Sequence, residues 1–317
     1  MINRKEYGKR SIIDIGSNNI YLLLGTISGD NVTVVKRHTG VTALSEGMRD
    51  GFLTLDAMDR TIIILRSFIS EAIDYSKDII ITGTSCSRDA KNKEYLIQEI
   101  WKNFHIHYRI LSAMEESYLT FYATQRSFQD IQNFVSFDIG GGSTELSIYN
   151  AGKLQNLVSI DLGLRRFQNK YSNDLQAIEK YINDALDHTN FTIPLMENWI
   201  GIGLSVGNLT NLKFHYRSYN HDSIHGKHVS KSDLIYLRNM IDKITDAELQ
   251  ELLPYEPQNK YVVLSSIIYI LILMERFHFN EFIVSNNNLT YGLLSLNEDL
   301  WMHIKSNKLD IEAINAN

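Results

Sequence analysis

The sequence is poor in the residues and segments that mark disulfide-bonded, membrane-spanning or flexibly linked proteins. Its single cysteine, Cys86, excludes a disulfide within the chain and suits a reducing compartment. Only three prolines occur, and no glycine- and serine-rich linker divides the chain. The longest apolar run, residues 261–274, is shorter than the ~20 residues that span a bilayer. The basic first residues lack the apolar core of a signal peptide, so we expect a cytoplasmic protein with no membrane partner.

The bulk composition indicates an ordered protein with two domains. The chain has 317 residues, more than one hydrophobic core usually supports, and 44% of them are hydrophobic. A formal net charge of −6 opposes sequence-independent binding to nucleic acid, so no nucleic-acid partner is expected. The same charge is compatible with a local basic site for a small polyanion.

Two similar segments suggest that the two domains are related. Residues 10–26, RSIIDIGSNNIYLLLGT, resemble residues 134–150, FVSFDIGGGSTELSIYN. Both are typical of a strand, a turn that begins Asp-Ile-Gly, and a second strand, with Asp14 and Asp138 in equivalent places. The repeat therefore indicates two structurally related halves.

Strands alternate with helical patterns after each repeat, which predicts an α/β fold. Thr54 and Ser230 precede two of these helical patterns as N-cap residues. We predict an N-terminal domain over residues 1–128 and a C-terminal domain over residues 129–317.

The glycines of the second repeat, Gly140–Gly142, follow an aspartate and precede a serine, a threonine and a glutamate. Glycine lets peptide N–H groups approach an anion with no Cβ in the way, and phosphate is the usual anion. A carboxylate at the end of the preceding strand would repel bare phosphate, but it suits Mg²⁺, which binds carboxylate and phosphate oxygens together. Such a turn is often only structural when it occurs alone, and its duplication here favours phosphate binding.

The order of several motifs resembles that in the exopolyphosphatase/guanosine pentaphosphatase (Ppx/GppA) family. These motifs are DIGSNN at 14–19, GTSCSRDAKN at 83–92, ILSAMEES at 110–117 and FDIGGGSTE at 137–145. The resemblance covers nearly the whole chain and implies the short form of the family. That form has two related ribonuclease H-like domains of the sugar kinase–actin–heat-shock ATPase superfamily, with a cleft between them. The implied activity is Mg²⁺-assisted hydrolysis of a terminal phosphate in that cleft.

The resemblance also implies roles for individual residues. The implied phosphate-binding residues are Gly16, Ser17, Asn18, Thr84, Ser85, Gly140, Gly141, Gly142, Ser143 and Thr144. The implied metal-binding carboxylates are Asp14, Asp138 and Glu145, and the implied catalytic residues are Glu116, Glu115, Arg88 and Glu145.

The chemistry of these residue types fits phosphate hydrolysis. The Arg88 guanidinium offers a planar fork of donors to phosphate oxygens, although a surface pair with Asp89 is the ordinary alternative. Adjacent residues of a helix point in different directions, so only one of Glu115 and Glu116 is expected to face the site. We favour Glu116 as the base that accepts a proton from the attacking water. A solvated acidic helix start is the alternative role for both.

Two departures from the family pattern predict weaker binding of a long polyanion. Leu204 stands where glycine is usual and would strain a turn that needs a positive φ, and Thr290 replaces a frequent arginine. We expect an exopolyphosphatase that acts on inorganic polyphosphate. The alternatives are hydrolysis of pppGpp to ppGpp in the stringent response, and a regulator that binds such an alarmone or nucleotide without turnover. Substrate preference and oligomeric state, including a homodimer, stay open.

Overall fold

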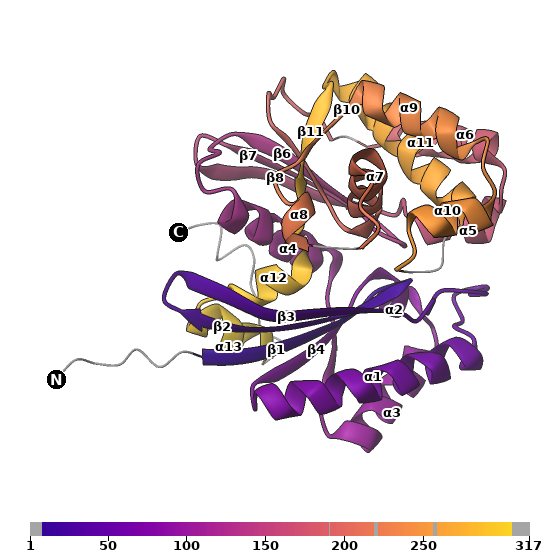
Figure 1. Cartoon of the computed structure of the whole chain (residues 1–317). Coiled ribbons are helices and arrows are strands. Elements are labelled where there is room, and N and C mark those ends of the chain that lie inside the picture. Colours follow the sequence, from indigo (N-terminus) through magenta and orange to yellow (C-terminus); the bar gives the residue numbers. More distant parts are fainter. Residues whose placement is uncertain (1–7, 190, 219–220, 256–258, 306–317) are drawn as a thin grey trace. The chain divides into compact units, whose positions relative to one another are not determined.

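The computed structural model describes residues 8–189, 191–218, 221–255 and 259–305 (Figure 1). Their contacts divide the chain into two compact units. Unit 1 combines the residues up to Arg126 with those from Leu289 onward, and unit 2 is Ser127–Asn288. Among the described residues, no helix has the length and hydropathy of a membrane span.

Unit 1 is built on one sheet whose strand order is β3-β2-β1-β4-β5. The first three strands are antiparallel, and β4 and β5 continue the sheet in parallel with β1. The elements of unit 1 are β1 (Gly8–Ile15), β2 (Asn19–Ser28), β3 (Asn31–Val41), α1 (Leu55–Tyr75), β4 (Ile79–Gly83), α2 (Ser85–Asp89), α3 (Lys93–Phe104), β5 (Tyr108–Ile110), α4 (Ala113–Ser127), α12 (Leu289–Leu294) and α13 (Glu298–Lys305).

Each face of the unit 1 sheet has its own hydrophobic layer. One face packs against α1 and α3, which lie side by side in Figure 1, with residues such as Ile13, Leu65 and Ile100 between them. Helix α1 begins at the predicted N-cap, because the Thr54 hydroxyl accepts the N–H of Ala57 at 3.3 Å. The other face is covered by residues of α4, α12 and α13.

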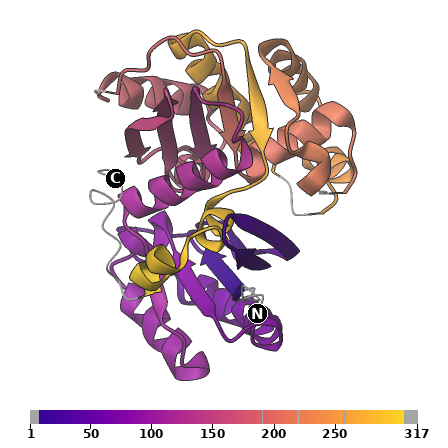
Figure 2. The same cartoon turned by 90° about the vertical axis from the view of Figure 1, so that its left-hand side faces the viewer.

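The C-terminal helices belong to unit 1, which differs from the predicted domain of residues 129–317. Leu293, Leu294 and Trp301 belong to one buried hydrophobic cluster with Ile12 of β1. Figure 2 shows the helices of this segment, in yellow, next to the strands of unit 1. The buried Arg10 guanidinium donates to the carbonyl of Leu296, and its Nη2 lies 3.0 Å from the carboxylate of Glu298. These contacts join residues far apart in the chain and leave no local sequence pattern. The sequence-based prediction therefore assigned the C-terminal helices to the same domain as the residues that precede them.

Unit 2 repeats the arrangement of unit 1 with one strand added at the edge. Its sheet has the order β10-β11-β9-β6-β7-β8, so β8-β7-β6-β9-β11 corresponds to β3-β2-β1-β4-β5. Its elements are β6 (Phe134–Ile139), β7 (Thr144–Asn150), β8 (Lys153–Ile160), α5 (Leu164–Tyr171), α6 (Leu175–Asp187), β9 (Trp199–Ile202), α7 (Leu204–Phe214), α8 (His221–Ile224), β10 (His228–Ser230), α9 (Lys231–Ile241), α10 (Asp246–Leu252), α11 (Lys260–Phe277) and β11 (Glu281–Ser285).

The apolar run noted in the sequence forms α11, which is buried within unit 2. Ile267, Tyr269 and Ile270 of this helix are fully buried in a hydrophobic core that includes Phe137 of β6 and Phe282 of β11. The two α/β sheets, related in strand order, confirm the predicted fold class.

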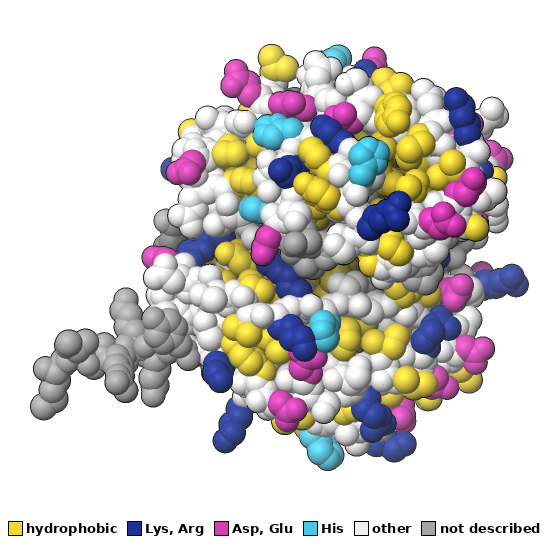
Figure 3. Space-filling model, viewed as in Figure 1, with side chains coloured by type: hydrophobic (Ala, Val, Ile, Leu, Met, Phe, Trp, Pro, Cys, Tyr) yellow, Lys and Arg dark blue, Asp and Glu magenta, His cyan; other side chains and the backbone are white. Residues whose placement is uncertain are grey.

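Charged side chains of both signs are interspersed on the face of each unit that Figure 3 shows. Neither unit presents a broad basic surface on that face, in keeping with the formal net charge of −6.

Candidate active site

Each sheet carries a turn between its first two strands, and the two turns share one geometry. In unit 1 the N–H of Gly16 donates to the carbonyl of Asn19 at 2.9 Å. In unit 2 the N–H of Gly140 donates to the carbonyl of Ser143 at 2.9 Å. A Cβ on Gly16 would lie 3.1 Å from the Asn19 carbonyl oxygen, and a Cβ on Gly140 would lie 3.2 Å from the Ser143 carbonyl oxygen. The sequence repeat therefore folds into equivalent turns.

The carbonyls of the unit 2 turn are held by the start of α5. The N–H groups of residues 164–166, which have no partner within the helix, donate to the carbonyls of Gly140 and Gly141 at 2.9 to 3.1 Å. The peptide N–H groups of residues 141–143 have no acceptor among the described residues. A turn whose carbonyls are hydrogen-bonded to the following helix and whose peptide N–H groups lack acceptors has the chemistry needed to bind an anion.

Gly163 and Arg166 fix this turn, and neither residue is in the predicted site. A Cβ at Gly163 would lie 2.4 Å from the carbonyl oxygen of Gly141, so the turn rests directly on the glycine backbone. Arg166 Nε donates to the carbonyl of Gly142 at 2.9 Å, and its Nη2 lies 3.6 Å from the Asp161 carboxylate. The run LGLRRF at 162–167 is the sequence signal for these two residues, because two arginines follow a glycine within three positions.

The unit 1 turn is held in the same way by the residues that follow β3. The carbonyl of Asn18 accepts the N–H groups of Thr42 and Ala43 at 2.9 and 2.8 Å. The carbonyl of Ser17 accepts the N–H of Ser45 at 3.0 Å. In both units, the segment after the third strand ties back the carbonyls of the turn.

Two carboxylate residues project from the same face of β6 and β7 in unit 2. Asp138 and Glu145 are register partners, and Glu145 is in turn the partner of Ser159 on β8. Partners in antiparallel strands project from the same face with their Cβ atoms about 5 Å apart. Ser159 Oγ donates to Glu145 Oε1 at 2.8 Å, and Glu145 is buried. Like charges in such positions repel, so the pair suits a bound cation.

Gly203, the residue before α7, makes room for Asp138. Its backbone has φ +93° and ψ 174°, a conformation that essentially only glycine adopts. A Cβ there would lie 2.6 Å from Asp138 Oδ1. The expectation of backbone strain at Leu204 is therefore wrong. Leu204 does not have a positive φ, and the residue that adopts one in this turn is Gly203. Ser205 Oγ donates to the carbonyl of Ile139 at 3.1 Å, at the end of β6.

Asp14 occupies the equivalent place at the end of β1 in unit 1. It is buried, and its Oδ1 accepts a hydrogen bond from Thr82 Oγ1 at 2.8 Å. The contact follows from the parallel register, in which Asp14 and Thr82 are partners on β1 and β4. The threonine therefore holds one carboxylate oxygen in a defined orientation.

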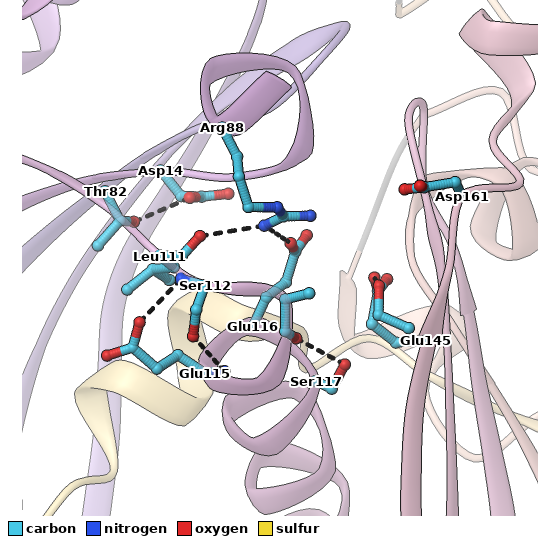
Figure 4. A network of polar contacts seen from close by, with 12 residues as sticks. Asp14, Thr82, Arg88, Leu111, Ser112, Glu115, Glu116, Ser117, Glu145 and Asp161 are labelled. Carbon is cyan, nitrogen blue, oxygen red and sulfur yellow. Dashed lines mark hydrogen bonds and ion pairs between the residues drawn. The ribbon is translucent and has the colours of Figure 1, made fainter. Parts of the chain in front are cut away.

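Arg88 and Glu116, also in unit 1, form an ion pair (Figure 4). Arg88 Nη1 donates to Glu116 Oε2 and to the carbonyl of Leu111, both at 3.0 Å. Nε and Nη2 of Arg88 have no acceptor among the described residues, so they are left for a ligand. Burial raises the pKa of the Glu116 carboxyl, and the contacts from Arg88 and Thr84 oppose that rise.

Glu115, unlike Glu116, makes its hydrogen bonds with residues at and before the start of α4. Its Oε1 accepts a hydrogen bond from Arg109 Nη2, and its Oε2 accepts the N–H of Ser112 at 2.8 Å. The N–H of Glu115 donates to Ser112 Oγ at 3.2 Å, which completes a capping box. The Ser-x-x-Glu spacing of residues 112–115 is the sequence signal for this contact. The geometry favours Glu116 over Glu115 as the group that meets a substrate.

Five predicted phosphate-binding residues with hydroxyl groups are buried: Ser17, Thr84, Ser85, Ser143 and Thr144. Three of them differ in their contacts. Thr144 is fully buried, and its Oγ1 donates to the carbonyl of Leu162 at 2.6 Å, so this hydroxyl serves the fold of the turn. Ser143 is also buried, within the turn itself. Ser85 Oγ is buried with no hydrogen-bond partner, at the start of α2 next to Thr84. The expectation that the site residues of both units share one cleft stays a prediction.

The two units, with their matching sheets and turns, define the class of protein. Solved structures with this fold include an exopolyphosphatase from Cytophaga hutchinsonii, with TM-score 0.81, 23% identity and coverage of 95% of this chain and 99% of that chain. Another is the Ppx/GppA enzyme of Aquifex aeolicus, with TM-score 0.76, 20% identity and coverage of 92% and 99%. The fold is thus the α/β fold of these Ppx/GppA enzymes and exopolyphosphatases, as predicted.

Residues 26–299 match the profile of the Ppx/GppA phosphatase family, and the chain belongs to that family. It is 25% identical to the bifunctional 3-dehydroquinate synthase/phosphatase of Fusobacterium nucleatum, over 90% of this chain and 46% of that protein. It is 26% identical to exopolyphosphatase 1 of Mycobacterium leprae over 51% and 49% of the two chains. It is 24% identical to the guanosine-5'-triphosphate,3'-diphosphate pyrophosphatase of Vibrio atlanticus over 61% and 40%. The chain thus spans less than half the length of these curated relatives.

Proposed function

We propose that the protein is a phosphohydrolase of the exopolyphosphatase type, which releases the terminal phosphate of inorganic polyphosphate. The observation that carries this proposal is the unit 2 turn, whose carbonyls are tied to α5 while the N–H groups of residues 141–143 are left over. A row of peptide N–H groups binds phosphate oxygens, and each hydrogen bond to a charged group is worth about 1.5–3 kcal/mol. The name of the Mycobacterium leprae relative supports this substrate class.

The chain's own residues would bind and orient the terminal phosphate. The turns beginning at Gly16 and Gly140 would donate peptide N–H groups to phosphate oxygens. Arg88 would add Nε and Nη2, the two nitrogens that its contacts with Glu116 and Leu111 do not use. Hydrolysis at phosphorus depends chiefly on such positioning and charge neutralisation, because there is little covalent chemistry for the protein to perform.

Glu116 would accept the proton of the attacking water. The water oxygen forms the new bond to the terminal phosphorus, the bridging P–O bond breaks, and the shortened chain leaves with that bond's electron pair. Burial raises the pKa of Glu116 above its ordinary value, which makes the carboxylate a stronger base. Glu145, held by Ser159, would orient the water or a cation.

The donor chemistry of unit 2 fits Mg²⁺. Asp138 and Glu145 lie on one face as opposed partners, and carboxylate oxygens are the hard ligands that this ion prefers. No group of three or more His, Cys, Asp and Glu side chains converges within the described part of the chain, so phosphate oxygens and water would complete the coordination. When bound, Mg²⁺ would neutralise charge on the transferring phosphoryl group. Asp14 stays the predicted carboxylate from unit 1.

The second candidate is the same hydrolysis on pppGpp, which would yield ppGpp. The name of the Vibrio atlanticus relative favours it, since that protein acts on guanosine-5'-triphosphate,3'-diphosphate. The proposed phosphate-binding groups would serve polyphosphate and pppGpp alike, since both substrates end in a phosphate chain. An alarmone-binding regulator without turnover is the third outcome that the experiment separates.

The test is phosphate release by the purified full-length chain with Mg²⁺ and either polyphosphate or pppGpp. Release from polyphosphate at the higher kcat/KM supports the first proposal, and the reverse order supports the second. Absence of release, together with binding of ppGpp by calorimetry, contradicts both and leaves the regulator. Glu116→Gln is the matched inactive control, because it keeps the shape of the side chain and removes its charge.

A further inference from the structure

The two neighbouring glutamates of α4 each pair with an arginine, but the pairs differ in their surroundings. Arg88 and Glu116 keep donors available to a ligand, as described above. Arg109 is only 8% exposed, and its Nη2 donates to Glu115. Nε and Nη1 of Arg109 are buried with no hydrogen-bond partner. Burial also lowers the pKa of the Arg109 guanidinium, an effect that Glu115 opposes.

Stability alone gives no reason for the Arg109–Glu115 pair. Moving two charges from water into a protein costs about as much as their attraction returns, and apolar replacements are often neutral or stabilising. Each buried donor without an acceptor adds a further cost, and Arg109 has two. Because burial of this ion pair brings no gain in the free energy of folding, we look for its role in the positions of the neighbouring groups.

That neighbouring group is the Arg88–Glu116 pair, which a short run of backbone connects to Glu115 (Figure 4). Glu115 Oε2 accepts the N–H of Ser112, and the carbonyl of the preceding residue, Leu111, accepts Arg88 Nη1. The other acceptor of Arg88 Nη1 is Glu116, the residue after Glu115. One acceptor of Arg88 Nη1 therefore precedes Ser112, whose N–H Glu115 accepts, and the other directly follows Glu115. Arg109 in turn holds Glu115.

We propose that Arg109 and Glu115 form a positioning pair that sets the placement of Glu116 and Arg88 without touching the substrate. This inference rests on the proposed phosphohydrolase function and assigns Glu115 a role other than that of base. Arg109 anchors Glu115, Glu115 fixes the turn at residues 111–112, and that turn presents the carbonyl which orients Arg88.

The test uses the double variant Arg109→Met/Glu115→Gln in the full chain. Methionine keeps the bulk of the arginine stem, and the glutamine Oε1 can still accept the N–H of Ser112, so the capping contact survives without charge. The matched control is Arg10→Met/Glu298→Gln. Arg10 is a second buried arginine of unit 1 that pairs with a glutamate, and it lies four residues from Asp14, about 13 Å along β1.

The positioning role predicts a loss of rate without a loss of stability. We expect kcat of the Arg109→Met/Glu115→Gln variant to fall by about tenfold to a hundredfold, since misplacement of catalytic groups by about 1 Å has effects of that size. KM should stay within about threefold, and the melting temperature should be unchanged or higher. The Arg10→Met/Glu298→Gln control should lower the melting temperature, because methionine cannot replace the hydrogen bond that Arg10 donates to the buried carbonyl of Leu296. It should leave kcat of the folded fraction unchanged. A kcat within about twofold of wild type in the Arg109→Met/Glu115→Gln variant overturns the inference.

A second readout separates failure of this inference from failure of the proposed function. If wild-type protein hydrolyses neither polyphosphate nor pppGpp, the proposed function fails, and the Glu116 carboxyl is followed instead by ¹³C NMR titration. Glu116→Gln identifies the signal by removing it. The contact with Arg88 opposes the rise in the pKa of Glu116, so the Arg109→Met/Glu115→Gln variant should move that pKa further upward. An unmoved titration overturns the inference whatever the activity.

Discussion

Replacing Gly203 by alanine should lower the stability of unit 2 only modestly and lower the activity more strongly, because the added methyl group displaces the Asp138 carboxylate. The backbone at Gly203 has φ +93° and ψ 174°, and holding a residue other than glycine there costs about 1–3 kcal/mol. The added Cβ would also lie 2.6 Å from Asp138 Oδ1. Overpacking of that kind costs a further 1–3 kcal/mol, roughly, unless the carboxylate moves. Domains are usually stable by about 5–15 kcal/mol, so most of the protein should stay folded.

The rate should fall by more than the loss of folded protein explains. Ordinary contact begins near 3.4 Å, so the Asp138 carboxylate has to move by about 0.8 Å to accommodate the methyl group. A shift of about 1 Å in a group that positions substrate or cation can cost about a hundredfold in rate. We therefore expect Gly203→Ala to lower kcat by roughly that factor and to raise the Mg²⁺ concentration needed for half-maximal rate.

Gly226→Ala is the matched control. Gly226 also has a positive φ of +74°, but a Cβ there would meet nothing within 4 Å. The substitution should cost about 1–2 kcal/mol of backbone strain with kcat unchanged. The assays are phosphate release and urea unfolding of both variants. Equal losses of kcat in Gly203→Ala and Gly226→Ala, or full activity of Gly203→Ala, would refute the assigned contact between Gly203 and Asp138.

Four further predictions concern the site. Glu116→Gln should lower kcat by about 10²–10⁴-fold while calorimetry still detects phosphate binding; an unchanged rate rules out Glu116 as the base. The acid limb of kcat/KM should lie above pH ~4.3, the ordinary glutamate pKa, because burial raises the pKa of Glu116 and its protonated form cannot accept a proton. The rate should fall as the pH drops through that limb, and a limb at or below the ordinary value contradicts the assignment. Arg166→Met removes the hydrogen bond to the Gly142 carbonyl and should weaken phosphate binding by about fivefold to tenfold, measured by calorimetry against Arg276→Met, a surface arginine paired with Asp187. EDTA should abolish turnover and added Mg²⁺ should restore it, whereas turnover that persists in EDTA excludes a required metal.

Some features of the molecule follow from local sequence alone. The segments at 10–26 and 134–150 predict two equivalent strand–turn–strand units, and the structure has both turns with the same hydrogen bond across them. Thr54 and Ser230 act as the predicted N-caps of α1 and α9. These features depend on backbone preferences and neighbouring residues, which a single sequence displays directly.

The contacts of individual side chains required the tertiary structure. Glu115 and Glu116 are adjacent and chemically alike, and only long-range contacts distinguish them, since Arg109 holds one and Arg88 holds the other. Thr144 belongs to the predicted phosphate loop, yet its hydroxyl donates to the carbonyl of Leu162. The sequence carried a signal for the Ser112–Glu115 capping box, but its spacing alone does not say what else the carboxylate contacts.

The sequence by itself determined the α/β fold class, the duplicated acid-and-glycine turns and the family. Tertiary structure decided that the helices after Leu289 complete unit 1, that Gly203 makes room for Asp138, and that Arg109 and Arg166 support the site. The physical reason is the range of the forces involved. Hydrogen bonding and chain entropy act between near neighbours, whereas packing and ion pairing join residues that are far apart in the chain.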